Sequence, residues 1–271
     1  MVECLAKHEW HTLELHDIHA HRLLQTGQPD DVGIRFKKFA ADHGISFPQC
    51  HFYVAKRDDS GKRIEWVDIA PASEKAFAQV IDDVRRWLDF LNALEVKAGV
   101  LHIGGGALKQ QGWTEERVFV RRAEALSAIA EYAESGPTTI CFENMEAPFG
   151  VSTVDGMLKV ISTVDRSNVG ICLDTGHAHL AGLRVSEFIL RAGDRLKALH
   201  INDNTGHTDD HILPYGKGTI DWEEVMRALQ FTGYDGLFNF EVPGESKCPK
   251  SVRALKLDYA LGLAKSMIGN T

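Results

Sequence analysis

Short β-rich runs alternate with longer segments of helical periodicity along the chain. Apolar and β-branched residues predict strands at residues 11–16, 45–54, 96–104, 138–144, 168–174, 195–203 and 236–242. Between these runs, apolar residues recur at intervals of three and four in segments such as 73–94 and 114–135, which predicts amphipathic helices. Such alternation is typical of a parallel sheet covered by helices, so the expected fold class is α/β.

The predicted strands are one short of a closed (β/α)8 barrel of the TIM type. Residues 2–10 resemble the end of a helix that would ordinarily follow a first strand. The pattern therefore predicts a TIM-type barrel that lacks its first β-strand or is truncated there. Either the sequence begins after that strand, or the barrel is incomplete and another element covers the gap. No linker or low-complexity tract divides the chain, so residues 1–271 are expected to form a single domain.

Composition argues against several classes of protein. The formal net charge of −8 does not favour nucleic acid or an anionic membrane surface as a partner. No window reaches the roughly 18 apolar residues of a membrane span, and the first residues lack the apolar region of a signal peptide. Five scattered cysteines without a C-x-x-C pair favour reduced thiols over disulfides or a sulfur-rich zinc site. The protein is therefore expected to be cytoplasmic.

Ionisable residues occur near the C-terminal ends of six predicted strands. They are His51, His102, Glu143, Asp174, His200 and Glu241. In barrels and doubly wound sheets these strand ends line the active site, so the six side chains are expected to converge on one mouth. Alternation within residues 236–242 turns Glu241 away from the neighbouring phenylalanines and lets it point into the barrel. Several buried carboxylates need a cation or protons to neutralise them, and a bound metal ion explains the set.

Two loops add further candidates. Asp209 and His211 form an Asp-x-His pair after His200, and carboxylate and imidazole ligands suit zinc, manganese or iron. A solvated acidic loop is the alternative interpretation of this pair. Lys217, between two glycines, could contact an anionic substrate, and a mobile surface lysine is the alternative. Asp221 begins a capping box for the next helix, so its predicted role is structural.

Four ordered segments carry a resemblance to a known family. They are CFENME, GICLDTGHAHLAG, LHINDN followed by Asp-x-His and GKGTIDW, and FNFEVP. In this order they resemble the sugar phosphate isomerase/epimerase family with the xylose-isomerase-like TIM barrel, a superfamily shared with endonuclease IV. The resemblance implies one divalent ion, manganese, magnesium, cobalt or zinc, held by Glu143, Asp174, His200 and Glu241. It further implies that His177 contacts a substrate oxygen.

The resemblance implies an activity as well as a fold. We expect a metal-dependent isomerase or epimerase of a small sugar or sugar phosphate, in which Glu143 and Glu241 act as acid and base on a proton beside a carbonyl. His102 and Lys217 are candidates for further substrate contacts. Loss of a β-hydroxyl group at the same site would instead give a dehydratase. The loop NTGHTDDH lacks the arginine that keto-sugar epimerases of this family usually offer there, which weakens a simple ketose 3-epimerase assignment.

Two other interpretations stay open. The endonuclease branch holds more than one zinc, and the positions of its additional ligands are occupied here by His51, His102, His177, Asp209 and His211. Acidic net charge and a loop of mixed charge after His51 argue against abasic DNA as the substrate. A metal-binding barrel without catalysis would not need the paired Glu143 and Glu241. A homo-oligomer is compatible with each of these interpretations.

Overall fold

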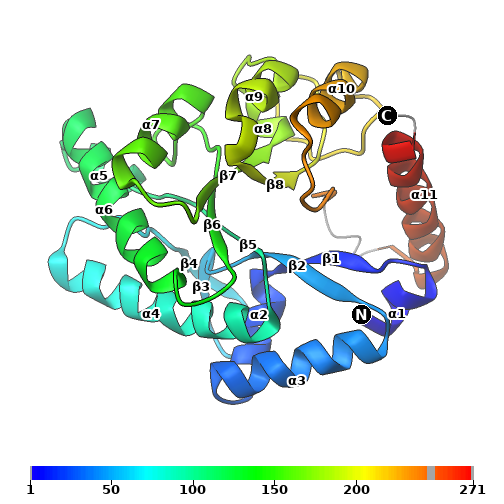
Figure 1. Ribbon diagram of the computed structural model, residues 1–271, viewed down its shortest axis with the longest axis horizontal. Helices are drawn as coiled ribbons and strands as arrows, with labels where there is room; N and C mark the ends of the chain where they lie inside the picture. Colours follow the sequence, from blue (N-terminus) through cyan, green and yellow to red (C-terminus); the bar gives the residue numbers. More distant parts are fainter. Residues whose placement is uncertain (1, 243–247, 270–271) are drawn as a thin grey trace.

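Six parallel strands form a curved sheet with helices on its outer side, an α/β half-barrel (Figure 1). The computed structural model describes residues 2–242 and 248–269. The strand order is β1-β2-β5-β6-β7-β8, and each neighbouring pair is parallel. The bounds are β1 (Thr12–His16), β2 (Ser46–His51), β5 (Ala98–Leu101), β6 (Thr139–Glu143), β7 (Val169–Asp174) and β8 (Leu196–His200). Six of the predicted strands are thus confirmed, with shorter bounds than the apolar runs suggested.

Helices follow the strands, and the longer ones cover the convex side of the sheet (Figure 1). They are α1 (Val2–Lys7), α2 (Asp17–Leu24), α3 (Pro29–Asp42), α4 (Glu74–Leu94), α5 (Gly106–Gln110), α6 (Glu115–Ala133), α7 (Val154–Val164), α8 (Thr175–Leu180), α9 (Val185–Ala192), a 3-10 turn (Gly193–Arg195), α10 (Trp222–Thr232) and α11 (Lys250–Gly269). The two helices predicted from periodicity correspond to α4 and α6. Ser73 and Thr114 cap them, because each hydroxyl accepts a hydrogen bond from a backbone N–H of the first turn.

The seventh predicted strand is reduced to a short bridge. The backbone N–H of Ile201 donates to the carbonyl of Asn239 at 2.7 Å, and the N–H of Glu241 donates to the carbonyl of Ile201 at 3.0 Å. The prediction of a full strand over residues 236–242 is therefore wrong in extent. This segment has a paired neighbour on one side only, which limits its ladder. Pro243, the last residue of the FNFEVP segment, lies outside the described residues.

The half-barrel is open between β1 and residues 239–241. No strand among the described residues lies in this gap, and the prediction of a barrel without its first strand is confirmed. The side chain of Asn239 spans the gap and donates to Glu14 Oε2 at 2.6 Å. Helix α11 lies on this side next to α1 (Figure 1), and Lys265 contacts Glu9 at 3.2 Å. A cavity of about 750 Å³ lies at the N-terminal ends of the strands, and α11 forms part of its lining.

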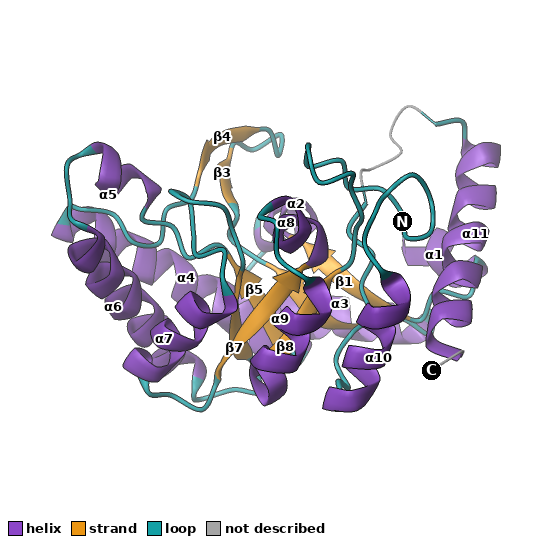
Figure 2. Cartoon of the chain, turned by 90° about the horizontal axis from the view of Figure 1, so that it is seen from above, coloured by secondary structure: helices purple, strands orange, loops and turns teal. Residues whose placement is uncertain are grey.

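A two-stranded antiparallel hairpin follows β2 and was not predicted. Its strands are β3 (Ala55–Arg57) and β4 (Arg63–Trp66), and it stands out from the body of the sheet (Figure 2). Asp17, directly after β1, anchors it. Arg57 Nη2 donates to Asp17 Oδ1 at 2.8 Å, and the backbone N–H of Ala55 donates to Asp17 Oδ2 at 3.2 Å. The hairpin therefore belongs to the loops at the C-terminal ends of the strands.

The main apolar core lies between the sheet and the helices, and a smaller cluster fills the concave side. The smaller cluster consists of Ala98, Val100, Cys141, Cys172 and Ala198. All five cysteines are free thiols, and Cys50, Cys141 and Cys172 are buried, as the scattered spacing predicted. Burial raises the pKa of Cys141 to about 12, so this thiol stays protonated. None of the described helices has the length and apolar character that crossing a membrane requires.

Candidate metal centre

Ionisable side chains terminate five of the six parallel strands, including His16 at the end of β1. The last residues of β2, β6, β7 and β8 are His51, Glu143, Asp174 and His200. His102 directly follows β5, and Glu241 lies in the bridged segment beside β8. Paired strands end at matching positions, as Asp174 opposite His200 shows. The six side chains therefore gather at one mouth, as the strand pattern predicted, while their chemical roles stay predictions.

The centre of this mouth holds four residues whose ligand atoms lie within 4.8 Å of one another. They are Glu143, Asp174, His200 and Glu241. His200 Nδ1 lies 3.1 Å from Glu241 Oε2 and 3.4 Å from Glu143 Oε1. Glu143, Asp174 and His200 are buried, whereas the side chain of Glu241 is 25% exposed. Three carboxylates and one imidazole form a donor set suited to a divalent ion such as zinc or manganese.

A second group of candidate ligands adjoins this set on the side of β2 and β5. The ligand atoms of His51, His102 and Glu143 also lie within 4.8 Å of one another. His102 Nε2 lies 3.1 Å from Glu143 Oε2, and His51 Nε2 lies 3.6 Å from that oxygen. Glu143 is therefore shared between the central group and this one.

A third group adjoins the centre on the side of β7. The ligand atoms of Asp174, His177 and His211 likewise lie within 4.8 Å of one another. Asp209 Oδ2 lies 3.5 Å from His177 Nε2 and 3.3 Å from His211 Nε2. The Asp-x-His pair of the sequence thus faces the mouth, although Asp209 is 43% exposed at its side chain. All nine residues that were predicted as metal ligands lie in one continuous cluster.

Buried ring nitrogens that make no hydrogen bond indicate that the cluster fits a metal ion. Among the described side chains, Nδ1 and Nε2 of His51 and Nδ1 of His200 are inaccessible to solvent and make no hydrogen bond. Leaving a buried polar atom unpaired costs about 1–3 kcal/mol. An imidazole nitrogen that ligates a divalent ion avoids this cost, and the ion also neutralises the carboxylates around it.

Burial and neighbouring charges shift the pKa values of these groups in opposite directions. Burial raises the pKa of Asp174 to about 7 and lowers that of His51 to about 4. Burial also opposes ionisation of Glu143, but the charge of His200 and hydrogen bonds from nearby histidines hold its pKa well below the usual value. In the same way, His200 outweighs burial and lowers the pKa of Glu241 to about 2. Histidine protons therefore balance the carboxylates, a role that a bound cation would take over.

The loop that carries Asp209 and His211 is fixed by a buried aspartate. Asp203 Oδ2 accepts a hydrogen bond from Trp222 Nε1 at 2.7 Å, and its Oδ1 accepts one from the backbone N–H of Ile220 at 3.2 Å. Gly218 packs so closely on this carboxylate that a Cβ atom there would clash with it. The GKGTIDW segment therefore stabilises the loop through its contacts with Asp203.

The structure also shows where the other residues of this region lie. Asp221 caps α10, because its carboxylate accepts a hydrogen bond from the N–H of Glu224 at 3.0 Å, as predicted. Lys217 is exposed, and no hydrogen bond or ion pair found between described residues joins it to the cluster. Its contact with an anionic substrate stays a prediction. His179 donates to or accepts from Thr219 Oγ1 at 2.8 Å, which places it in a loop contact outside the cluster.

Sequence reasoning missed three polar residues that support the ligands. Asn144 Oδ1 accepts a hydrogen bond from the backbone N–H of Asp174 at 2.6 Å, and Asn202 Nδ2 donates to Asp174 Oδ2 at 2.7 Å. Glu14 Oε1 lies 3.0 Å from His200 Nε2. Glu14 had a detectable signal, since it alternates with two leucines in TLELH and must share a face with interior positions. Asn144 directly follows the end of β6, and Asn202 lies two residues after the end of β8.

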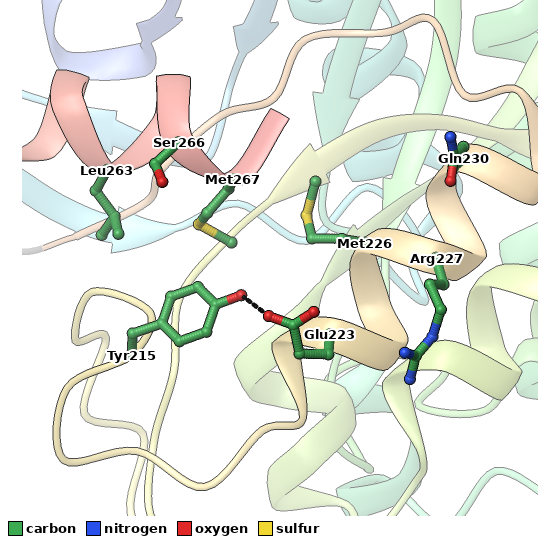
Figure 3. A pocket seen from close by; sticks show the side chains of 8 residues that line it. All are labelled: Tyr215, Glu223, Met226, Arg227, Gln230, Leu263, Ser266 and Met267. Carbon is green, nitrogen blue, oxygen red and sulfur yellow. Dashed lines mark hydrogen bonds between the residues drawn. The ribbon is translucent and has the colours of Figure 1, made fainter. Parts of the chain in front are cut away.

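A separate cavity lies away from this cluster. It has a volume of about 440 Å³ and is lined by residues of α10, α11 and the preceding loop (Figure 3). Tyr215 donates a hydrogen bond to Glu223 Oε1 at 3.0 Å across it. None of the candidate ligands lines this cavity, so it is not the place where the clustered carboxylates would act.

Comparison with known families agrees with this geometry. Residues 2–260 match the model of the family described as the xylose isomerase-like TIM barrel. The chain belongs to this family. The resemblance expected from the four sequence segments is thereby confirmed.

Curated relatives of this xylose isomerase-like barrel include sugar isomerases. MJ1311, an uncharacterised protein of Methanocaldococcus jannaschii, is 31% identical over 70% of this chain and 66% of its own length. An inosose isomerase of Bacillus subtilis is 24% identical over 62% of this chain and 62% of its own length. The chain therefore spans about two thirds of the length of these relatives or less.

Solved structures share the fold over nearly the whole chain. A D-psicose 3-epimerase determined in the presence of D-fructose has a TM-score of 0.76 at 17% identity, covering 99% of this chain and 92% of that one. The IolI protein with a bound zinc atom has a TM-score of 0.76 at 21% identity, covering 99% and 91%. At these identities the likeness shows the α/β barrel fold alone.

Proposed function

We propose that this xylose isomerase-like barrel is a divalent-metal-dependent isomerase or epimerase of a small sugar or sugar phosphate. The observation that carries the proposal is the convergence of Glu143, Asp174, His200 and Glu241 within 4.8 Å at the strand ends. The names of relatives support the reaction class, since they include inosose isomerase, fructoselysine 3-epimerase and D-psicose 3-epimerase.

The four central residues would hold the ion. When bound, a divalent ion supplies a Lewis acid that stabilises negative charge on substrate oxygens as a proton leaves the carbon beside the carbonyl. Glu143 and Glu241 are the proposed acid and base. Glu241 is the more accessible of the two, while Glu143 is buried and bound by histidines on several sides. Glu241 is therefore the better placed to take a proton from a substrate that enters from the mouth.

Two histidines have proposed roles around this reaction. His177 lies half-buried beside Asp174, with Nε2 facing Asp209, so it can donate a hydrogen bond to a substrate oxygen at the mouth. His102 holds Glu143 Oε2 at 3.1 Å and can orient that carboxylate. Returning the proton to the opposite face of the same carbon gives an epimer, and returning it to the neighbouring carbon gives an aldose–ketose pair.

Elemental analysis and hydrogen exchange test the proposal together. Protein purified without chelator is expected to contain at least one manganese, magnesium, cobalt or zinc ion per chain. Incubated with inosose or D-psicose in D2O, it should introduce deuterium at the carbon beside the carbonyl, as seen by NMR. Glu241→Gln should lower this exchange by about 10²–10⁴-fold, the usual contribution of a general base. Glu115→Gln, at an exposed position on α6, is the matched control. Protein that binds no metal and exchanges no hydrogen would contradict the proposal.

A second candidate function is favoured by the two adjoining ligand groups. They add His51, His102, His177, Asp209 and His211 around the shared carboxylates. Three such groups suit a multi-zinc phosphodiesterase, in which the ions clamp the attacking and leaving oxygens. Two or three zinc ions per chain, together with cleavage of bis(p-nitrophenyl) phosphate or of DNA with an abasic site, would favour this candidate over the isomerase.

A further inference from the structure

Glu14 lies at the junction between the metal centre and the open side of the half-barrel. It is on β1, and its side chain is 9% exposed. Three donors converge on its carboxylate: Gln49 Nε2 at 3.1 Å, Asn239 Nδ2 at 2.6 Å and His200 Nε2 at 3.0 Å. No lysine or arginine within the described ranges forms an ion pair with it. A nearly buried carboxylate that binds two amide groups and one imidazole, with no lysine or arginine beside it, needs an explanation.

We propose that Glu14 is a positioning residue of the metal centre, which fixes the ring of His200 and the place of Glu241. The inference rests on the proposed function, because it assigns a partner to two of the proposed metal ligands. A carboxylate can only accept, so the contact at 3.0 Å requires the proton of His200 to be on Nε2. A metal ligand must be a neutral imidazole, and a ring that keeps this proton on Nε2 offers its lone pair at Nδ1, the nitrogen that faces Glu143 and Glu241.

The carboxylate therefore decides which nitrogen of His200 can bind a cation. A histidine whose other ring nitrogen donates to a carboxylate is held in one tautomer and one orientation, and it becomes a stronger ligand. His200 Nδ1 is also one of the buried nitrogens without a hydrogen-bond partner, which fits a ligand atom aimed at the central group.

Asn239 provides the second connection. It precedes Glu241 by two residues and shares its face, and this segment pairs with the sheet on one side only, through Ile201. The contact of Asn239 with Glu14 at 2.6 Å ties the unpaired side of the segment to β1 across the gap. Because no strand fills the gap within the described chain, this side-chain contact replaces strand pairing beside Glu241.

Cobalt binding to the complete chain tests the proposal. In Glu14→Gln, the new side-chain NH2 group can only donate, and all three groups around it are donors. One of the three hydrogen bonds is therefore lost. The variant should bind Co²⁺ about 10–100-fold more weakly at unchanged stoichiometry, with an altered Co²⁺ absorption spectrum. The double variant Glu14→Gln/Asn239→Asp places an acceptor opposite the new amide and should recover most of the affinity. Glu65→Gln, at an exposed position on β4, is the matched control and should bind like the wild type.

Other outcomes would overturn the proposal. Unchanged Co²⁺ affinity in Glu14→Gln with a lower unfolding temperature of the metal-free form would make Glu14 a structural brace. Loss of one Co²⁺ equivalent would make it a direct ligand, since Glu14, His51 and His200 also meet the 4.8 Å limit. If Glu14→Gln does not fold, Asn239→Ala takes its place and should weaken Co²⁺ binding while leaving the His200 contact. A wild-type protein that binds no Co²⁺ would instead refute the proposed function itself.

Discussion

The buried pair of Asp17 and Arg57 allows a quantitative test of how the β3–β4 hairpin is held above the mouth. The proposed change is Asp17→Asn. Asp17 is fully buried and accepts hydrogen bonds from Arg57 Nη2 at 2.8 Å and from the N–H of Ala55 at 3.2 Å. Asparagine keeps the shape but removes the charge, which leaves the guanidinium of Arg57 unpaired at a side-chain exposure of 10%.

Two estimates of the cost agree in order of magnitude. Burial alone would raise the pKa of Asp17, but hydrogen bonds from His16 and Arg57 outweigh it and lower the value from 3.8 to about 2. A shift of this size corresponds to about 2 kcal/mol of stability. Breaking a buried ion pair by removing one partner costs about 3–5 kcal/mol. We expect Asp17→Asn to lower the free energy of unfolding by about 2–4 kcal/mol at neutral pH.

The pH dependence follows from the lowered pKa. The charged form of Asp17 stabilises the folded chain fully above the unfolded pKa of about 3.8, and this contribution is lost as the pH falls toward about 2. The difference between wild type and Asp17→Asn should therefore be constant at neutral pH and shrink below about pH 4.

Urea unfolding followed by circular dichroism measures both effects. Asp59→Asn, in the exposed turn of the same hairpin, is the control. Asp17→Asn/Arg57→Met removes both charges and should recover part of the loss, because no buried cation remains unpaired. A loss below about 0.5 kcal/mol, the range of ordinary surface substitutions, would refute this account of the pair.

Three further predictions address the core, the loop and the metal. Phe142→Ala, at a fully buried position in β6, should cost about 3–5 kcal/mol in urea unfolding. Asp203→Ala removes the acceptor of Trp222 and should destabilise the protein by about 1–3 kcal/mol while lowering the metal content measured by elemental analysis, because Asp209 and His211 lose their support. Removal of metal by EDTA should lower the unfolding temperature, and re-addition of Mn²⁺ or Zn²⁺ should restore it, since an ion at about 1,000 times its dissociation constant contributes about 4 kcal/mol. Insensitivity to EDTA in a metal-containing sample would contradict the central cluster as the binding site.

The strand-end residues were predictable because two simple rules apply to them. A parallel strand that is buried on both faces has a short apolar sequence. Its last residue lies at the edge of the sheet where the C-terminal ends of all the strands meet. Glu143, Asp174 and His200 each end such a run, so their meeting required no knowledge of the loops. Asp221 was predictable for a similar reason, because a helix cap depends on local sequence.

The hairpin and the interior network were not predictable in the same way. The strands β3 and β4 are held by Asp17, which is 40 residues from Arg57 in sequence, and nothing in the local pattern of residues 55–66 requires this partner. Glu14 had the alternation of an interior residue, but its partners His200 and Asn239 come from distant parts of the chain. Contacts of this kind depend on how the half-barrel curves to bring its two edges near each other, which a single sequence does not specify.

The candidate metal ligands and the residues around them come from different parts of the fold. The central carboxylates and His200 come from strand ends in the rigid sheet, the positions at which the sequence resemblance implied metal ligands. The surroundings of the mouth come from loops, among them the hairpin in which the exposed Ile64 and Trp66 lie and Arg63 stacks on the Trp66 ring at 3.9 Å. Relatives with different substrates share the fold at low identity, so the sheet cannot be what distinguishes those substrates. We therefore propose that the residues that select a substrate lie in the hairpin and in the loop of Asp209, and that the candidate metal centre sets only the class of reaction.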